Sequence, residues 1–445
     1  MTRMRAIRRI TLRTSALALG LAALTVPHAT AAESTAGAVT RTRLGNGFTV
    51  LVRENPVAPV MAVSLQVKMG NRWESRANAG ISNLLQLMLV RGTTRLNGTQ
   101  IVEAADRMGG SIDATSDVDA AEISATALAR YRADILDLVA DVALHPSVQQ
   151  GTFESVRDFL VRQVRNRGDK PYFVALDTLT AKIYGPNPYA WDPIGLKESL
   201  ERIDRDALLT HYRRHYVPGG MVLAVSGRVQ SAEVVAQAER LFGSMPPGAA
   251  PVPDPPKPPA PAASRDALTI PGAQAQIVMG RLAPSLTDPD YTAVKVLSSI
   301  LGGGMAGRFF SDLRDKQGLA YTTATQFSSR VDPSFFLGLL GTAPANVAKA
   351  EAALRGELER IQREPVADEE LRVGKAYLLG NLEMDRRTNA RQAWYLAFFE
   401  VAGVGYEFLD RYVARVPQIT PAEVQSAAQR YLSPLRAVIV EPPAK

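Results

Sequence analysis

Polar and apolar residues alternate in several short stretches near the start of the chain. The segment 41–53 contains the pair Asn46-Gly47 between residues that favour strands, and Asn-Gly is a strong turn signal for a β-hairpin. Residues 60–69 and 111–127 show the same two-residue alternation. We therefore expect a hairpin followed by further strands that are each half-buried.

Between and after these strands, apolar residues recur at helical spacing. The segments predicted to be helical in this first part are 79–90, 100–108, 130–145, 153–167, 172–183 and 204–216. Residues 221–225 (Met-Val-Leu-Ala-Val) are apolar throughout, which is typical of a short strand buried on both faces.

A proline-rich stretch then interrupts the pattern at residues 246–264. Proline fixes φ and lacks a backbone N–H, so this stretch cannot form the interior of a helix or strand. We expect a stiff, extended linker. It separates a first domain at 33–245 from a second at 265–445.

The second part repeats the first in outline. We expect strands near 275–281 and 335–340, and helices at 289–301, 345–362, 367–383 and 420–432. Residues 216–225 and 431–440 match best, because in each a helix ends at Tyr, a chain breaker follows and a buried strand closes the domain. The predicted fold class is α+β: two homologous domains, each an antiparallel-rich sheet covered by helices on one side.

The first 32 residues have the composition of an export signal. They contain five arginines and no acidic residue, then an apolar run at 15–26 that is too short to span a bilayer, then small residues before a predicted cleavage near Ala32. An uncleaved anchor is the alternative. Arg8-Arg9 leaves the twin-arginine and general secretory routes both open. We expect an exported protein, located in a bacterial periplasm.

Charge and cysteine content exclude several functions. Removing the five arginines of the signal from the formal charge of +7 leaves only +2 on the mature chain. No basic patch with interleaved aromatic residues is visible, so we expect no nucleic-acid partner. The absence of cysteine excludes disulfides, thiolate catalysis and Cys-type zinc sites. Beyond the signal, no stretch is apolar for long enough to cross a membrane.

Two further patterns have a spacing that is typical of binding sites. His211 and His215 have the i, i+4 spacing of zinc ligands, but two arginines lie between them and no nearby carboxylate suggests a third ligand. The glycines at 302–304 lack the Lys-Ser/Thr of a phosphate loop. We expect neither a metal site nor a phosphate site there.

Residues 79–93 (Ala-Gly-Ile-Ser-Asn-Leu-Leu-Gln-Leu-Met-Leu-Val-Arg-Gly-Thr) resemble the active-site helix of the M16 (pitrilysin-like, inverted zinc-binding) metallopeptidases. That family carries His-x-x-Glu-His, with a distal glutamate ligand roughly eighty residues downstream. The matching positions here are Asn83, Gln86 and Leu87, with Gln163 in the distal segment. None of these side chains can serve as the expected zinc ligand or general base. The resemblance therefore implies an inactive zinc motif, with no metal in this chain.

A second segment, 301–321, resembles the M16 segment in which a glycine-rich stretch precedes Leu-Arg-x-x-x-Gly-Leu-Ala-Tyr. The resemblance implies that Arg314 and Tyr321 bind substrate, orient its backbone and stabilise a developing oxyanion. Their alternative roles are those of a surface arginine and a core tyrosine. Gly302, Gly303 and Gly304 could form a backbone contact loop or simply a structural turn.

These observations lead to two hypotheses. In the first, the chain is the non-catalytic, substrate-binding subunit of a heteromeric exported M16 zinc peptidase. A homologous partner with His-x-x-Glu-His then carries the zinc, and the substrates are unstructured peptides. In the second, the chain is a homo-oligomeric peptide-binding or scaffold protein without peptidase activity. In both, the isolated chain has no peptidase activity of its own.

Overall fold

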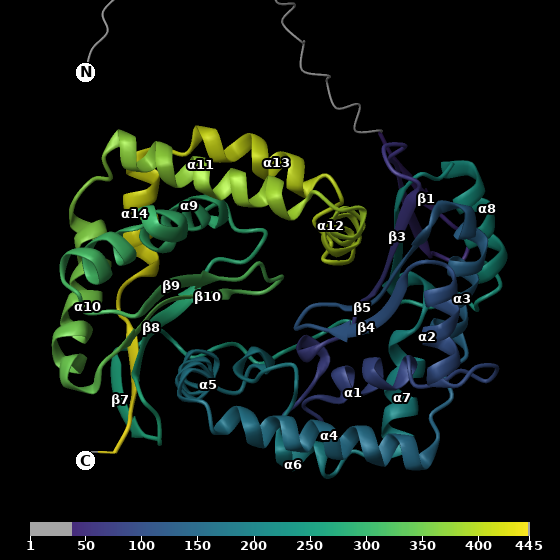
Figure 1. Cartoon of the computed structure of the whole chain (residues 1–445), viewed down its shortest axis with the longest axis horizontal. Coiled ribbons are helices and arrows are strands. Elements are labelled where there is room, and N and C mark those ends of the chain that lie inside the picture. Colours follow the sequence, from purple (N-terminus) through teal and green to yellow (C-terminus); the bar gives the residue numbers. More distant parts are fainter. Residues whose placement is uncertain (1–37, 444–445) are drawn as a thin grey trace, which may run out of the picture. The chain divides into compact units, whose positions relative to one another are not determined.

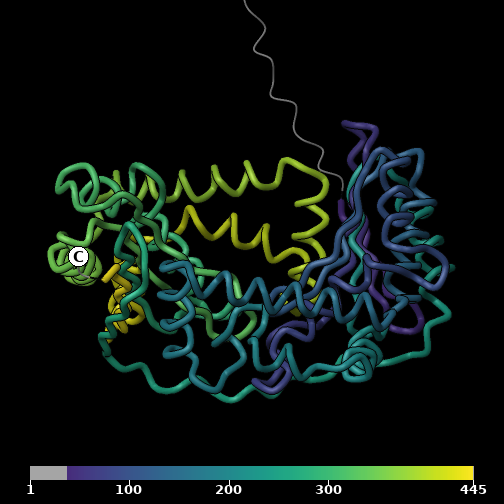
Figure 2. The backbone as a smooth tube through the Cα atoms, turned by 60° about the horizontal axis from the view of Figure 1, so that its bottom comes forward, coloured from purple at the N-terminus to yellow at the C-terminus, as the bar shows by residue number. Residues whose placement is uncertain are grey.

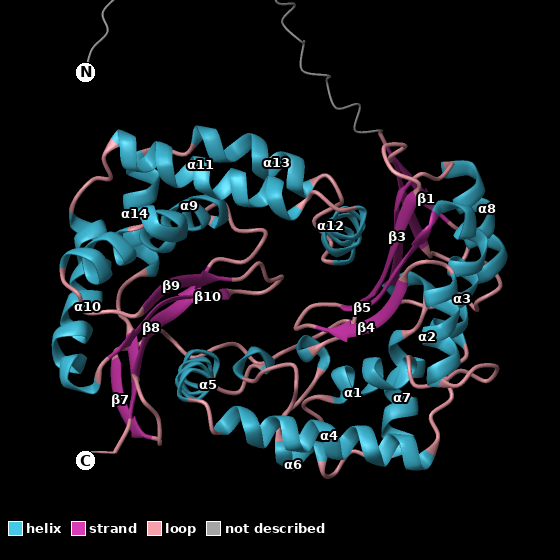
Figure 3. Cartoon of the chain, in the orientation of Figure 1, coloured by secondary structure: helices cyan, strands magenta, loops and turns pink. Residues whose placement is uncertain are grey.

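Residues 38–443 are described by a computed structural model, in which they belong to one compact unit. The predicted export signal lies outside the described residues. We call residues 38–245 the first half and residues 264–443 the second half, and Figures 1 and 3 show their helices and strands. No helix within the described residues is both long and apolar enough to cross a membrane.

The first half contains six strands and its main helices alternate with them. The strands are β1 (Val39–Arg43), β2 (Thr49–Glu54), β3 (Val60–Val67), β4 (Ser111–Ser116), β5 (Ala121–Leu128) and β6 (Met221–Gly227). The helices are α1 (Ile81–Leu89), α2 (Gly98–Arg107), α3 (Arg132–Leu144), α4 (Gln150–Gly168), α5 (Pro171–Tyr184), α6 (Lys197–Leu200), α7 (Arg205–His215) and α8 (Ser231–Phe242).

The second half contains five strands. They are β7 (Ser264–Thr269), β8 (Ala275–Ala283), β9 (Thr322–Phe327), β10 (Ser334–Thr342) and β11 (Arg436–Glu441). The α-helices are α9 (Tyr291–Gly302), α10 (Val347–Arg363), α11 (Asp368–Asp385), α12 (Asn389–Val401), α13 (Phe408–Arg415) and α14 (Pro421–Tyr431). The segment Phe309–Lys316 forms a π-helix.

The two sheets share one topology. The first has the strand order β1-β2-β6-β3-β5-β4 and the second β7-β11-β8-β10-β9. In each, the closing strand pairs in parallel with an early strand, β6 with β2 and β11 with β7, and every other pairing is antiparallel. Apart from the extra edge strand β1, the order repeats strand for strand. The α+β fold class and the internal repeat expected from the sequence are therefore confirmed.

Each half contributes one helix that packs on the other half's sheet. Helix α5 contacts β8 and β11 of the second sheet, and α12 contacts β3 and β6 of the first. Figure 1 shows α5 in teal beside the green strands and α12 in yellow-green beside the purple and blue ones. The two halves therefore share a core and do not merely touch.

The packing of α5 and α12 on the sheet of the other half, which we call the helix exchange, follows from the central strands. Both faces of these strands are apolar. In β11, Ala437 and Ile439 belong to the core of the second half, while Val438 and Val440 pack with residues of α5. In β6, Leu223 and Val225 face the first core, and Val222 and Ala224 join the cluster that contains α12. The expectation of helices on one side only was wrong, because a strand without a polar face needs cover on both sides.

Residues 246–263 contain no helix or strand and can be followed by colour in Figure 2. Three hydrogen bonds hold this segment along the first half: Gly219 N to Gly248 O at 2.9 Å, Trp73 Nε1 to Pro251 O at 2.8 Å and Asn187 Nδ2 to Pro256 O at 2.8 Å. The domain boundaries that we placed around it stay a prediction, because α5 and α12 each pack on the sheet of the other half.

Candidate functional site

Helix α1 carries three of the four zinc-motif positions, Asn83, Gln86 and Leu87, and two of these side chains lie in contact with the interior. Gln86 is fully buried, and its Nε2 donates a hydrogen bond to the Tyr216 hydroxyl at 2.7 Å. Leu87 packs against the first hydrophobic core. Asn83 lies on the same helix and is partly exposed, whereas Gln163 is exposed on α4.

The beginning of α1 is fixed by a buried carboxylate. Glu74 accepts the main-chain N–H groups of Gly80 and Ser82, both at 2.9 Å. These are orphan donors of the first helical turn, and a negative charge there is favoured by the helix dipole. Burial raises the pKa of Glu74, and the same hydrogen bonds lower it. The arrangement sets where α1 starts and how it is oriented.

His211 and His215 lie together beneath α1. Their rings are 4.4 Å apart, the Nε2 of His211 is 3.0 Å from the Ser82 hydroxyl, and the Nδ1 of His215 is 2.7 Å from the Lys68 carbonyl oxygen. Burial lowers the pKa of His211 to about 3 and that of His215 to about 4. Both are therefore neutral near pH 7 and bind to protein groups.

The Ser82–His211 pair resembles half of a nucleophilic site, but its surroundings argue for a structural role. Ser82 is only 1% exposed, so no substrate atom can approach its hydroxyl. A catalytic serine must reach the scissile carbonyl, with oxyanion donors nearby. The pair instead ties α7 to the start of α1.

The glycines at 302–304, which we call the glycine turn, end α9 and begin a 3-10 helix at Gly304–Ala306. Their predicted role as a backbone contact loop stays a prediction. A Cβ added to Gly302 would lie 2.4 Å from Thr325 Oγ1, and one added to Gly303 would lie 2.1 Å from the Ser299 carbonyl oxygen. Gly304 has φ +67° and approaches the ring of Tyr377. Glycine is therefore required here for close packing and for backbone conformation. Met305, at the tip of this turn, is 77% exposed.

Two arginines of the neighbouring π-helix region have opposite environments. Arg308 makes a two-pronged contact with Glu370, at 2.5 and 2.8 Å, which fixes it inside the structure. Arg314 is exposed, and its guanidinium lies 4.7 Å from the centre of the Phe310 ring. Among the described residues, no carboxylate forms an ion pair with Arg314. Its fork of N–H donors is available to a ligand.

Tyr321 directly precedes β9, the edge strand that packs against the π-helix. Its main-chain N–H donates to the Gly341 carbonyl at 2.8 Å, which fixes the backbone. The side chain is 54% exposed, and its hydroxyl has no hydrogen-bond partner within residues 38–443. The alternative of a core tyrosine therefore does not match the structure. The predicted roles of Arg314 and Tyr321 in substrate binding stay predictions.

Two family models match this chain. Residues 49–192 match the family model described as Insulinase (Peptidase family M16), and residues 202–378 match the model described as Peptidase M16 inactive domain. The two matches follow one another along the chain and together include parts of both halves. The chain belongs to the M16 peptidase family. The resemblance inferred from the sequence is thus confirmed.

Curated relatives within this family are similar along most of their length. An uncharacterized zinc protease of Streptomyces coelicolor is 25% identical over 408 residues, covering 89% of this chain and 88% of the relative. One of Mycobacterium leprae is 26% identical over 398 residues, covering 89% of each chain.

Solved structures show the same fold. A peptidase M16 inactive domain from Pseudomonas fluorescens aligns with a TM-score of 0.85 and 22% identity, covering 92% of this chain and 98% of that one. A protease from Helicobacter pylori aligns with a TM-score of 0.85 and 21% identity, covering 91% and 100%.

The residues at the M16 zinc-motif positions do not fit the metal of the family. Zinc needs imidazole, thiolate or carboxylate ligands, and the motif positions here supply two buried or half-buried amides, a leucine and an exposed glutamine. The Nε2 of Gln86 already donates to Tyr216, whereas its buried Oε1 has no hydrogen-bond partner within residues 38–443; a single amide oxygen does not make a zinc site. Across residues 38–443 no three His, Cys, Asp or Glu side chains lie close enough together to hold a metal ion.

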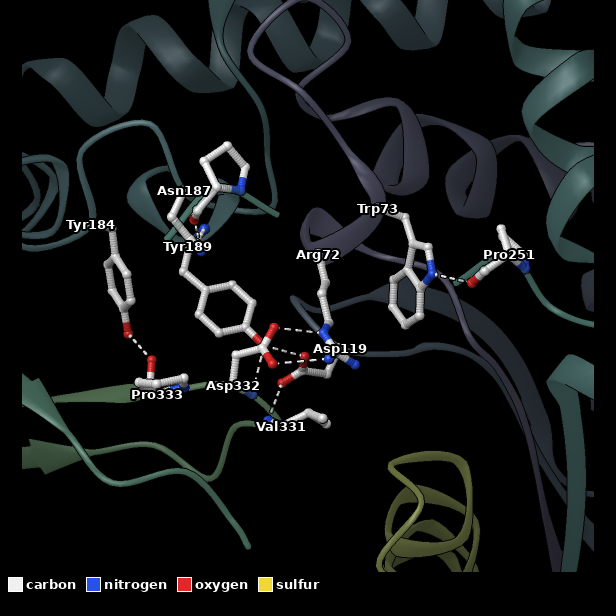
Figure 4. A network of polar contacts seen from close by, with 11 residues as sticks. Arg72, Trp73, Asp119, Tyr184, Asn187, Tyr189, Pro251, Val331, Asp332 and Pro333 are labelled. Carbon is white, nitrogen blue, oxygen red and sulfur yellow. Dashed lines mark hydrogen bonds and ion pairs between the residues drawn. The ribbon is translucent and has the colours of Figure 1, made fainter. Parts of the chain in front are cut away.

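A polar network joins the two halves near the turn between β9 and β10 (Figure 4). Arg72 makes a two-pronged contact with Asp332 at 2.7 and 2.9 Å, and Asp119 accepts the Val331 N–H at 3.0 Å and the Tyr189 hydroxyl. Burial raises the pKa of Asp119 to about 6, although Tyr189, Val331 and nearby arginines lower it. Sequence reasoning missed this network, because Asp119 lies in an ordinary polar turn and its partners are distant in the sequence.

Proposed function

We propose that this M16 chain is the non-catalytic, substrate-binding subunit of a heteromeric exported peptidase, with the zinc on a homologous partner that carries His-x-x-Glu-His. The observation that carries the proposal is a contrast between two segments of the chain. The positions of the zinc motif are occupied by side chains that cannot bind zinc, and two of them, Gln86 and Leu87, pack inside the protein. Arg314 and Tyr321, by contrast, are exposed and have no ion-pair or hydrogen-bond partner for their side chains within residues 38–443.

In this proposal Arg314 and Tyr321 act on the peptide and not on the metal. The guanidinium of Arg314 offers a fixed fork of donors, which suits a peptide carbonyl or carboxylate oxygen. The Tyr321 hydroxyl offers one directional donor. Placed beside a scissile bond, such donors position the substrate and stabilise developing negative charge on the carbonyl oxygen. Arg314 lies on the π-helix, and the backbone of Tyr321 is held by its hydrogen bond to Gly341.

The first experiment identifies the partner. The tagged mature chain is purified from the exported fraction of its own host, and co-purifying proteins are identified by mass spectrometry. A homologue with His-x-x-Glu-His supports the proposal. Self-association alone would overturn it in favour of the homo-oligomeric peptide-binding or scaffold protein, and recovery only from the cytoplasm would overturn the assignment to the periplasm.

The second experiment tests the two residues in the reconstituted complex. Arg314→Ala and Tyr321→Phe are each expected to lower kcat/KM for an unstructured peptide at least about tenfold, because each removes donors to the transition state. Complex formation should be unchanged by size-exclusion chromatography. Arg355→Ala is the matched control, since Arg355 lies on α10 with a side chain 38% exposed and makes only a 3.8 Å ion pair with Glu351. Wild-type turnover in both site variants would remove the assignment.

A further inference from the structure

A cavity of about 280 Å³ lies beside the network that joins the two halves. Its wall combines Asp117, which directly follows the edge strand β4, with Gln326 at the end of the edge strand β9. The aromatic rings of Tyr189, Trp191 and Phe335 also line it. Neither the zinc-motif positions nor Arg314 and Tyr321 belong to this cavity.

One charged side chain in the wall lacks the partners that its burial requires. The Nε and Nη1 atoms of Arg330 are buried and make no hydrogen bond within residues 38–443. The residue as a whole is half-buried and lines the cavity, so its guanidinium can be reached from there. The guanidinium instead lies 4.8 Å from the centre of the Tyr189 ring and 5.4 Å from that of Phe335. Aromatic faces compensate part of the lost hydration of a cation, but they do not accept its N–H groups as an oxygen does.

The carboxylates nearby are already engaged by other groups. Asp177 and Asp192 both pair with Arg167, which also lines the cavity, at 2.7 and 3.0 Å. Asp117 accepts the Val118 N–H at 2.7 Å. Asp119 and Asp332, just outside the cavity, are held by the contacts shown in Figure 4. These acids keep the surroundings of Arg330 negative without supplying it with an acceptor.

From this geometry we propose that the cavity binds the carboxylate at the C-terminal end of a peptide, with Arg330 as its hydrogen-bonding counter-ion. A planar carboxylate matches the guanidinium fork. A single negative charge fits better than a phosphate dianion, because Asp117, Asp177 and Asp192 share the same wall. The terminal side chain packs on the apolar part of the lining, where Leu176 and Phe335 lie.

The test compares two ligands on the isolated full chain by isothermal titration calorimetry. The probes are N-acetyl-Gly-Phe with a free carboxylate and the same dipeptide as its C-terminal amide. We expect saturable binding of the acid, and binding about tenfold weaker or more for the amide, since only the acid forms a charge-assisted pair. Equal binding of the two probes, or no binding of the acid, would overturn the proposal.

Variants and a small competitor sharpen the result. Arg330→Gln should reduce affinity for the acid about tenfold or more, with little effect on the amide, whereas the surface variant Arg355→Gln should bind as wild type does. Arg330→Lys retains the charge and should recover only part of the affinity, because it lacks the fork. Acetate that binds as tightly as the dipeptide would overturn the assignment to a peptide. Because no partner chain and no turnover are involved, this outcome is independent of the proposed function.

Discussion

The buried carboxylate of Asp119 accepts the main-chain N–H of Val331, which belongs to the other half of the chain, at 3.0 Å. The Tyr189 hydroxyl donates to the same carboxylate, and the Tyr184 hydroxyl donates to the Pro333 carbonyl oxygen at 3.0 Å. Side chains of the first half therefore hold the turn between β9 and β10 by binding main-chain groups of that turn. Such contacts depend little on which side chains occupy the turn.

The pH dependence of stability should reveal Asp119. Burial raises its pKa from 3.8 to about 6, so between these values the folded form holds the proton more tightly than the unfolded form does. The contribution of this group to stability is thus largest below about pH 4 and declines as the pH rises to about 6. Asp119→Asn should remove that decline, so its stability relative to wild type should improve by about 2 to 3 kcal/mol between pH 4 and pH 7.

Urea unfolding at a series of pH values measures this difference. Asp113→Asn, at an exposed position on β4, serves as the control and should run parallel to wild type. If the Asp119→Asn curve also ran parallel to wild type over the whole range, the carboxyl would not titrate as inferred.

The buried histidines should act in the opposite direction over a similar range. Burial lowers the pKa of His211 to about 3 and of His215 to about 4. Between these values and the ordinary pKa of 6.5, the unfolded chain therefore binds protons that the folded chain does not bind. Their contribution to stability is complete above about pH 6.5 and is lost as the pH falls toward 4. We expect His211→Gln to remove at least about 2 kcal/mol of this acid-dependent loss.

Gln163→Asn, at an exposed position on α4, is the control and should be as acid-sensitive as wild type. The measurement is again the free energy of unfolding in urea, taken between pH 4 and pH 8. A His211→Gln variant as acid-sensitive as wild type would show that this imidazole is hydrated in the folded protein.

The glycine turn should tolerate alanine poorly at Gly304. Its φ of +67° is strained for any residue with a side chain, and an added Cβ would lie 2.8 Å from the Tyr377 ring. Gly318 has a similar φ of +61° but nothing within 4 Å of an added Cβ. We expect Gly318→Ala to cost about 1 kcal/mol from strain alone, and Gly304→Ala to cost about 1 to 3 kcal/mol more. Thermal or urea unfolding of the pair checks this, and equal costs would mean that Tyr377 moves aside freely.

Restoring part of the M16 motif should not create a peptidase. The double variant Asn83→His, Gln86→Glu still lacks ligands at Leu87 and Gln163, so a metal would have one imidazole where three protein ligands are needed. It also places a buried carboxyl where Gln86 now donates to Tyr216. We expect no zinc-dependent cleavage of an unstructured peptide and a lower melting temperature. Cleavage that disappears with a chelator would show that α1 had been aligned wrongly.

Much of the fold could be predicted from local patterns. The Asn46-Gly47 hairpin forms as expected, with Arg43 opposite Thr49, and the Thr420–Glu423 capping box starts α14. Helices α6, α8, α12 and α13 were missed, as were β7 and β9. The segment 111–127, expected as one alternating stretch, is divided by a turn at 117–120 into β4 and β5. Helix α12 (Asn-Ala-Arg-Gln-Ala-Trp-Tyr-Leu-Ala-Phe-Phe-Glu-Val) is apolar on several sides because it is enclosed between the two halves, so no single face marks it as amphipathic.

Of the candidate site residues, some could be predicted from the sequence and others could not. Arg314 and Tyr321 could be named from a contiguous sequence motif. Arg330 could not, because its significance depends on two aromatic rings and on acids from the other half that are already engaged. Likewise, nothing in the segment 172–183 indicates that its helix belongs to the second sheet, since an apolar face specifies that it needs a partner but not which one.

The exchanged helices α5 and α12 also bear on how this chain can be divided. If the peptide bond were cut within 246–263, each fragment would keep its own sheet but lose the helix that covers one face of it. Two such fragments produced separately would expose apolar strands and aggregate, whereas produced together they would reassemble into a non-covalent pair. The chain is in this sense equivalent to two fused protomers that have exchanged a helix. The linker 246–263 keeps the two halves close together, whereas the exchanged helices cover their sheets.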